Sequence, residues 1–193
     1  MEEIIKNEIK EHIEVINETL SKQEKKIKEI IQLILDCYKN KGKVVLFGNG
    51  GSAADAQHIA AELVGKYKLE RKSLPALALT TNTSIISAIG NDYGFDVIFE
   101  KQIEGLVKKE DVVIGISTSG NSENILKGVL KAKKLGAKTI AFTGKSGGKL
   151  KDKVDILLNI PSDNTPRIQE AHITVGHIIC GIVESEIFKR KSI

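Results

Sequence analysis

From residue 43 onward, short runs of apolar residues alternate with segments of helical pattern. The runs predict strands at residues 44–47, 76–79, 112–116, 139–142 and 156–160. The segments between and after them predict helices at about 52–66, 83–90, 97–107, 122–135 and 167–188. Runs that are apolar throughout, without polar alternation, suit strands buried on both faces. The alternation therefore predicts an α/β fold, in which helices cover both sides of a five-stranded parallel sheet.

The first 40 residues have a different pattern, which predicts two helices. The apolar residues of the first helix step by 4, 4, 3 and 4: Ile5, Ile9, Ile13, Ile16 and Leu20. Ser21 and Glu24 match a capping box and predict the start of a second helix. Such narrow apolar stripes need a partner, either the chain's own core or another subunit. We expect one domain over 1–193, with residues 1–40 as helices for oligomer packing and 41–193 as the α/β core.

Composition and charge exclude several classes of protein. The net charge is +4, acidic and basic residues interleave, 4% of residues are aromatic and Trp is absent. A nucleic-acid binder usually clusters its positive charge and offers aromatic platforms for bases, so we expect no nucleic-acid partner. No uncharged apolar run approaches ~18 residues, and the N-terminus lacks a secretory signal. We expect a cytoplasmic protein without membrane contact, in which Cys37 and Cys180 are reduced, buried thiols.

Two polar segments follow the first two predicted strands, where open α/β sheets bind ligands. Residues 48–52 read Gly-Asn-Gly-Gly-Ser and open a helix, for which Ser52 is a natural N-cap. Glycines let the backbone approach a ligand, and helix amides favour an anion or a polar sugar. A tight strand-to-helix turn that binds no ligand would need the same glycines and serine. Further on, Asn91-Asp92 is usual turn chemistry, unless it faces the same cleft.

A loop rich in hydroxyl groups follows the third predicted strand. Residues 117–122 open another helix and hold four hydroxyls: Ser117, Thr118, Ser119 and Ser122. Hydroxyls and backbone amides at a helix N-terminus suit a phosphate monoester. Because a helix cap needs only one hydroxyl, the excess favours phosphate binding over capping alone.

Two helices carry candidate acid/base or metal-binding side chains. His58 and Glu62 are four residues apart and share a helix face. Such a pair can be general acid/base machinery or two metal ligands, but a surface hydrogen bond is the more frequent arrangement. On the last helix, Gln169 and His177 differ by about 80° and lie on one side. His172 is offset from both, so we expect it to be structural or at a subunit contact.

Taken together, these segments closely resemble the phosphoheptose isomerase family, which is built on the sugar isomerase (SIS) domain. The resemblance covers nearly the whole chain and rests on residues 48–52, 55–58, 62–63, 74–76, 91–92, 117–122 and 167–170 with His172 and His177. It implies a flavodoxin-like, five-stranded parallel sheet in a homotetramer with active sites at the subunit interfaces. It also implies isomerisation of sedoheptulose 7-phosphate to D-glycero-D-manno-heptose 7-phosphate, in bacterial heptose precursor synthesis.

The resemblance also implies a role for each matching residue. Glu62 and His177 would be the acid/base pair. The phosphate would lie on Ser117, Thr118, Ser119 and Ser122. The sugar would contact Asn49, Gly50, Gly51, Glu62, Asn91, Asp92 and Gln169. One zinc ion per subunit would be held by His58, Glu62, Gln169 and His177, and no nucleotide cofactor is implied. Lys66 stands where the family often has arginine, which keeps the charge but loses the planar fork.

The chemistry of the residue types fits this activity, and two other activities stay open. A ketose–aldose conversion moves a proton between C1 and C2 through an enediol, and a carboxylate and an imidazole can divide that work. One alternative is a non-catalytic SIS-domain protein that binds the bacterial replication initiator; the presence of Glu62 and His177 together favours the enzyme. Another is an isomerase of a hexose or pentose phosphate; residues 1–40 and 167–170 favour the heptose group. A sugar-phosphate-sensing regulator would need a DNA-binding motif, and 1–40 show no convincing one.

Overall fold

The computed structural model of the chain describes residues 1–188 and contains the five-stranded parallel sheet that the sequence predicts. Its strands are β1 (Val44–Gly48), β2 (Ala76–Ala78), β3 (Val112–Ser117), β4 (Lys138–Thr143) and β5 (Ile156–Asn159). All five lie at the predicted apolar runs, with ends that differ by one residue or none. The order in the sheet is β2-β1-β3-β4-β5, and every pair is parallel.

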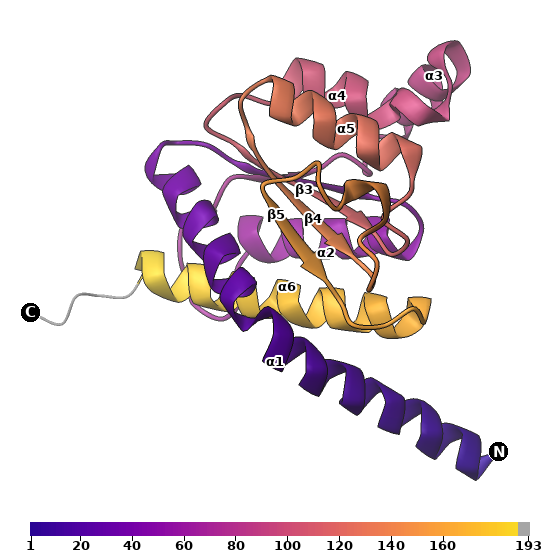
Figure 1. The fold of residues 1–193 in the computed structure, drawn as a ribbon. Helices are drawn as coiled ribbons and strands as arrows, with labels where there is room; N and C mark the ends of the chain where they lie inside the picture. Colours follow the sequence, from indigo (N-terminus) through magenta and orange to yellow (C-terminus); the bar gives the residue numbers. More distant parts are fainter. Residues whose placement is uncertain (189–193) are drawn as a thin grey trace, which may run out of the picture.

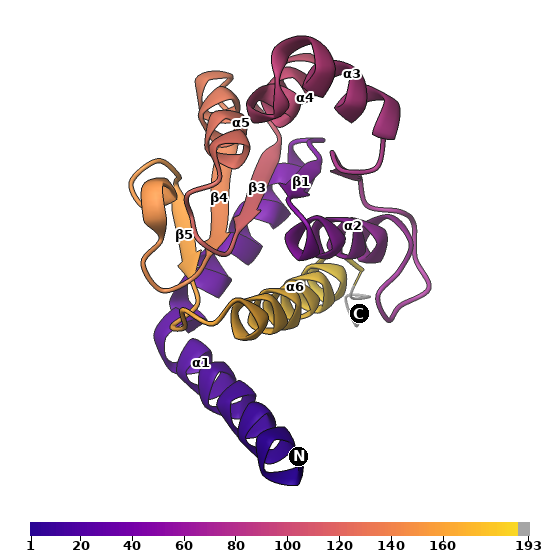
Figure 2. The same ribbon diagram turned by 90° about the vertical axis from the view of Figure 1, so that its right-hand side faces the viewer.

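Helices cover both faces of this sheet, as Figures 1 and 2 show. On one face lie α1 (Glu2–Lys39), α2 (Gly51–Val64) and α6 (Thr165–Phe188); on the other lie α3 (Thr83–Tyr93), α4 (Ile98–Leu106) and α5 (Glu123–Lys134). Short 3₁₀ helices span Phe95–Val97 and Gly148–Leu150. Alternate strand residues feed two separate cores: Val44 and Leu46 face α1, α2 and α6, whereas Val45 and Phe47 face α4 and α5.

The N-terminal region is one continuous helix, so the predicted break at Ser21 is wrong. Ser21 does not cap a second helix; its hydroxyl donates to the carbonyl of Glu18 within α1. No glycine or proline interrupts the region, and an ion pair between Glu18 and Lys22 spans the position at i, i+4. The capping-box residues therefore lie in the middle of a helix of 38 residues.

The two halves of α1 differ in what covers their apolar stripe. The C-terminal half packs into the core through Ile27, Ile30, Ile31 and Ile34. The N-terminal half extends beyond the α/β body (Figure 2). There the isoleucines at positions 5, 9 and 13 are 53%, 56% and 52% exposed. The chain's own core therefore covers only half of the stripe.

The strand order places the candidate loops side by side. The chain leaves β1 toward β2 on one side, and β3 then pairs with the other side of β1, so the order reverses between β1 and β3. The last residue of β1, Gly48, is in register with Ile116 of β3. The loops that follow β1 and β3 therefore flank the switch point, where open α/β sheets bind ligands.

The C-terminal helix α6 runs alongside α2 in close contact. A side chain at Gly176 would come within 2.7 Å of Ile59, so the glycine allows the two helices to approach. By length and composition α6 could also cross a membrane, although Glu170 and Glu184 interrupt its apolar sequence. In this structure it is a core helix: Ala171, Val175 and Ile179 are buried against the sheet and its neighbouring helices.

Candidate active site

The glycine loop after β1 is fixed to the helix that follows the serine loop. Asn49 and Asn124 form a reciprocal amide pair, with two hydrogen bonds of 2.9 Å. Gly50 has φ +53°, a left-handed conformation that favours glycine, and it is the N-cap of α2. The prediction of Ser52 as the cap is wrong, because the helix begins at Gly51 and Ser52 is buried in its first turn. Asn124 was not predicted as a site residue.

The serine loop gathers its hydroxyls at the start of α5. Ser122 is the N-cap residue but makes no side-chain cap bond; its Oγ lies 3.0 Å from Oγ of Ser117. Thr118 and Ser119 line a cavity of about 270 Å³, to which the loop after β4 contributes Lys145. These hydroxyls and the Lys145 ammonium suit a phosphate, although the carboxylate of Asp163 also lines this cavity. Ser117 and Ser122 are not among its lining residues.

Three of the predicted acid/base and metal-binding side chains meet between α2 and α6. Nε2 of His58 lies 3.1 Å from Oε1 of Glu62 and 3.2 Å from Nε2 of His177. One ligand atom from each of the three residues lies within 4.8 Å of the others. The side chain of His58 is 49% exposed, and that of Glu62 is 23% exposed, so the cluster is open to a ligand. The addition of His177 distinguishes this arrangement from an ordinary surface pair.

Gln169 lies two turns before His177 on α6, and it is next to the glycine loop. A Cβ atom at Gly51 would overlap the amide group of Gln169, so the glycine makes room for that side chain. The amide of Gln169, which belongs to α6, therefore lies beside the start of α2. His58, one member of the cluster, is two turns further along α2. Because α2 and α6 run side by side in the same direction, all four predicted metal ligands lie along the contact between the two helices, which we call the seam.

We expect the substitution Gly51→Ala to reduce turnover while leaving the protein folded. The added methyl displaces the end of a flexible side chain, so the melting temperature should change by no more than about 2–4 °C, which corresponds to roughly 1 kcal/mol. Displacement of Gln169 should nevertheless lower kcat/KM about tenfold or more. Gly105→Ala in α4 is the matched control, because a Cβ there meets no atom within 4 Å. Equal activity of the two variants would exclude a role for the Gly51–Gln169 contact.

Two of the residues predicted to contact the sugar, Asn91 and Asp92, make no hydrogen bond to the glycine loop or the serine loop within the described part of the chain. Asn91 and Asp92 are exposed in the last turn of α3, where Asn91 donates a hydrogen bond of 2.8 Å to Asp92. They are helical, so the interpretation as turn residues is wrong. Their role in sugar binding stays a prediction.

His172 is structural, as its offset on the helix predicts. It is fully buried, its Nε2 lies 3.1 Å from the carbonyl oxygen of Thr143, and its ring packs 5.6 Å from that of Phe142. Burial lowers the pKa of His172 to about 4, so it is neutral at pH 7.

The structure adds Asp55 and Tyr67 to the surroundings of the histidines. Asp55 lies three residues before His58 and has a buried carboxylate oxygen without a hydrogen-bond partner. Burial raises the pKa of Asp55 to about 6, although the nearby His58 opposes the shift. The ring of Tyr67 stacks on that of His177. The motif 55–58 contained the signal for Asp55, whereas nothing in the spacing indicated Tyr67.

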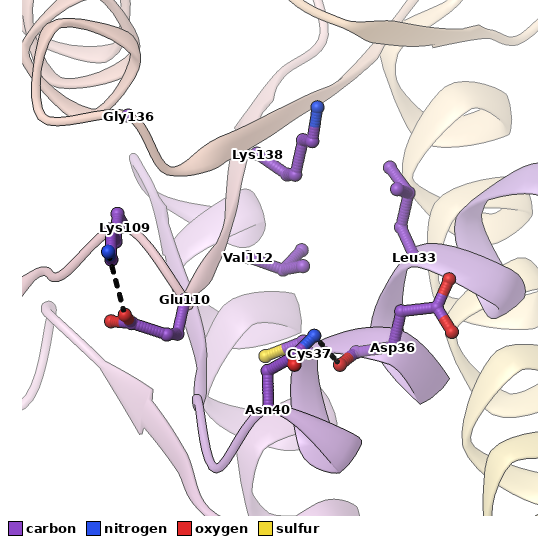
Figure 3. A pocket seen from close by; sticks show the side chains of 9 residues that line it. All are labelled: Leu33, Asp36, Cys37, Asn40, Lys109, Glu110, Val112, Gly136 and Lys138. Carbon is purple, nitrogen blue, oxygen red and sulfur yellow. Dashed lines mark hydrogen bonds and ion pairs between the residues drawn. The ribbon is translucent and has the colours of Figure 1, made fainter.

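A larger cavity, of about 640 Å³, opens at the amino-terminal ends of the strands (Figure 3). Val112 and Lys138, the first residues of β3 and β4, line it together with Cys37 of α1. Its charges are mixed, and Lys109 already pairs with Glu110. Burial raises the pKa of Cys37 to about 11, so its thiol is unreactive at neutral pH. The hydroxyl-rich loop follows the opposite, carboxyl end of β3, and the histidine cluster lies between α2 and α6.

Comparison with known proteins identifies the family. The SIS domain family model matches residues 8–144. A phosphoheptose isomerase of Sulfurimonas denitrificans is 53% identical over 191 residues, which is 97% of either chain. The chain belongs to the phosphoheptose isomerase family. Two solved phosphoheptose isomerases have the same fold: that of Neisseria gonorrhoeae (TM-score 0.89, 44% identity, 95% and 98% coverage) and that of Francisella tularensis (0.92, 40%, 95% and 97%).

Proposed function

We propose that the chain converts sedoheptulose 7-phosphate to D-glycero-D-manno-heptose 7-phosphate in bacterial heptose precursor synthesis. One observation carries the proposal: Glu62, His58 and His177 converge between α6 and α2, the helix that begins at the glycine loop. Family relatives that match the whole length of the chain support it, because they bear the name of this activity. No feature of the described residues favours a non-catalytic role.

Glu62 removes the proton from C1 of the ketose, and His177 exchanges protons with the substrate oxygens. A partly exposed carboxylate such as that of Glu62 can take a carbon-bound proton and later return it to C2. His177 approaches from α6, and Nε2 of His58 lies within 3.2 Å of both His177 and Glu62. Two groups on different helices can therefore act on neighbouring atoms of one enediol.

The two loops divide the remaining contacts with the substrate. The hydroxyls of the serine loop (Ser117, Thr118, Ser119 and Ser122) hold the phosphate with the N-terminus of α5. Asn49, Gly50 and Gly51 contact the sugar, and Gln169 adjoins them across the seam. Asn91 and Asp92, which are not joined to these loops within the described part of one chain, complete the sugar contacts across a subunit interface.

Three of the four predicted ligands, His58, Glu62 and His177, lie close enough together to hold one zinc ion per subunit. The amide of the fourth, Gln169, lies beside Gly51, two turns along α2 from His58. Zn–N bonds of about 2.0–2.1 Å place neighbouring tetrahedral ligand atoms roughly 3.4 Å apart. The separations of 3.1 and 3.2 Å around His58 Nε2 are close to that value. His58, Glu62, Gln169 and His177 would hold the ion, which would polarise the substrate carbonyl. A carboxylate that binds the ion is less available as a base, so Glu62 would have to exchange between the two tasks.

The chain assembles into a homotetramer in the cytoplasm, and the exposed apolar stripe of α1 supports contact between copies. The isoleucines at positions 5, 9 and 13 and Leu20 line the protruding half of the helix. Ile178 and Ile182, on the outer side of α6, are 44% and 42% exposed near His177. Burial of these side chains between copies would stabilise the assembly and place the active sites at subunit interfaces.

The activity can be tested by NMR with a panel of sugar phosphates. We expect purified protein to convert sedoheptulose 7-phosphate to an aldose heptose phosphate, and to act more slowly on hexose and pentose phosphates. Turnover should fall after chelation and return with zinc. If folded protein converts only a hexose or pentose phosphate, the proposed substrate is wrong. If it converts none of them, the non-catalytic alternative gains support, and binding to the replication initiator can be measured directly.

A further inference from the structure

The segment 65–75, which joins α2 to β2, is fixed to α6 by a buried carboxylate. Glu184 is 1% exposed and accepts hydrogen bonds from the backbone N–H groups of Tyr67 (2.9 Å), Lys68 (2.7 Å) and Leu69 (2.8 Å). It also accepts a hydrogen bond of 2.9 Å from Nε of Arg71. Four donors on one carboxylate hold the backbone of Tyr67 at a fixed place beside α6.

Arg71 connects the same segment to the end of the helix that carries Glu62. Its Nη2 donates to the carbonyl oxygen of Glu62 at 2.8 Å, and its Nη1 donates to those of Leu63 at 2.8 Å and Gly65 at 3.2 Å. These carbonyls belong to the last turn of α2, where helices leave acceptors unpaired. The Arg71–Glu184 pair thus ties the segment, α2 and α6 together.

Tyr67 uses this fixed backbone to place its ring against His177. The two ring centroids are 5.6 Å apart, with an angle of 26° between the planes. His177 also meets the ring of His58 edge-on, with centroids 4.9 Å apart. Gly181 lies one helical turn after His177, and a Cβ there would come within 3.0 Å of the Tyr67 ring. The glycine therefore leaves the space that the tyrosine ring occupies.

We propose that Tyr67 is a positioning residue, which fixes the orientation of the His177 imidazole for proton exchange with the substrate oxygens. Rotation about χ2 of histidine is only weakly restricted by its own torsional energy, so the stacked Tyr67 ring and the Nε2 contact to His58 together determine the orientation. The contact is made by the face of the ring, and the role does not need the phenol hydroxyl. This inference rests on the proposed function, because it takes His177 to be the group that exchanges protons with the substrate.

The test compares Tyr67→Leu with Tyr67→Phe. Leucine removes the aromatic ring, whereas phenylalanine keeps the ring and removes only the hydroxyl. We expect Tyr67→Leu to lower kcat about 10- to 100-fold, the cost of misplacing a reacting group, with a KM within about threefold of wild type. Tyr67→Phe should retain kcat within about twofold. A catalytic hydroxyl would remove this difference, because the phenylalanine variant would then be as impaired as the leucine variant.

NMR of histidine labelled with ¹³C at Cε1 provides a readout that is independent of activity. The chain has four histidines, so His177→Gln identifies the resonance of His177. Stacking on an aromatic face shifts the imidazole protons upfield, so we expect a downfield shift in Tyr67→Leu and no shift in Tyr67→Phe. Gly181→Ala, which pushes the ring away without altering it, should move the resonance in the same direction as Tyr67→Leu.

Two outcomes would overturn the inference: an unchanged His177 resonance in Tyr67→Leu, or a shifted resonance with wild-type kcat. Failure of the proposed function would look different. In that case His177→Gln itself would keep full turnover, or the wild-type protein would have none, while the resonance shift in Tyr67→Leu would persist.

Discussion

Replacing Glu62 by glutamine is expected to abolish measurable isomerisation while leaving the protein folded. The amide keeps the size of the side chain but cannot accept a proton from carbon at neutral pH. General base catalysis contributes about 10²–10⁴-fold, so the loss of kcat should lie at the upper end of that range. The side chain is 23% exposed and bonds only at its tip to His58, so the melting temperature should change by less than about 4 °C. The measurement is the initial rate with sedoheptulose 7-phosphate, together with a thermal melt.

Glu104→Gln is the matched control for this substitution. It makes the same chemical change on an exposed position of α4, on the opposite face of the sheet from α2. The control should keep full activity. A Glu62→Gln variant with more than about a tenth of wild-type kcat would refute the assignment of Glu62 as the base, because no general base could then be missing.

The second large effect concerns stability, for which Glu184→Gln is the decisive variant. Gln offers one acceptor oxygen where the carboxylate has two, and its NH₂ group opposes the backbone N–H donors of residues 67–69. The charge of Arg71, whose side chain is 2% exposed, loses its partner. Breaking a buried ion pair on one side costs about 3–5 kcal/mol, which corresponds to a fall of roughly 10 °C in melting temperature. Glu70→Gln, in the same segment but exposed, should change stability by less than about 0.5 kcal/mol.

The pH dependence of stability gives an independent check on Glu184. Burial alone would raise the pKa of its carboxyl, but the N–H groups of Tyr67, Leu69 and Lys68 and the Arg71 guanidinium lower it to about 2. A carboxyl whose folded-state pKa is lowered stabilises the protein above its unfolded-state pKa, here 4.5, and loses that contribution as pH falls from 4.5 toward 2. Urea melts between pH 6 and 3 should therefore show a steeper loss for wild type than for Glu184→Gln. Parallel curves would contradict this account of the pair.

The sheet and the main loops could be predicted from the sequence because each depends on local pattern. Strands buried on both faces require unbroken apolar runs, and such runs placed all five strands. The loops follow from the strand order, which brings the ends of β1 and β3 together. The pairing of the His58–Glu62 helix with His177 needed the resemblance to the family, because residues 119 positions apart share no local signal.

The features that the sequence did not reveal depend on tertiary contacts. Ser21 matches a capping box, but helix propensity on both sides and an i, i+4 ion pair keep α1 continuous. Ser52 could cap a helix, but Gly50 takes the cap position with its positive φ. The stacking of Tyr67 on His177 requires Gly181 and the Arg71–Glu184 pair, which come from two distant segments. The local spacing of residues does not predict such an arrangement.

The central claim, proton transfer through an enediol with Glu62 as the base, is tested most directly by running the reaction in D₂O. The carboxylate of Glu62 is partly open to solvent, so a proton that it holds can exchange before it returns to C2. We predict that the aldose heptose 7-phosphate formed by the wild-type protein carries deuterium at C2 by NMR and mass spectrometry, and that Glu62→Gln forms neither product nor exchanged substrate. An aldose without deuterium at C2, even after the reaction has reached equilibrium, would contradict the account, because the hydrogen would then have moved directly between the two carbons.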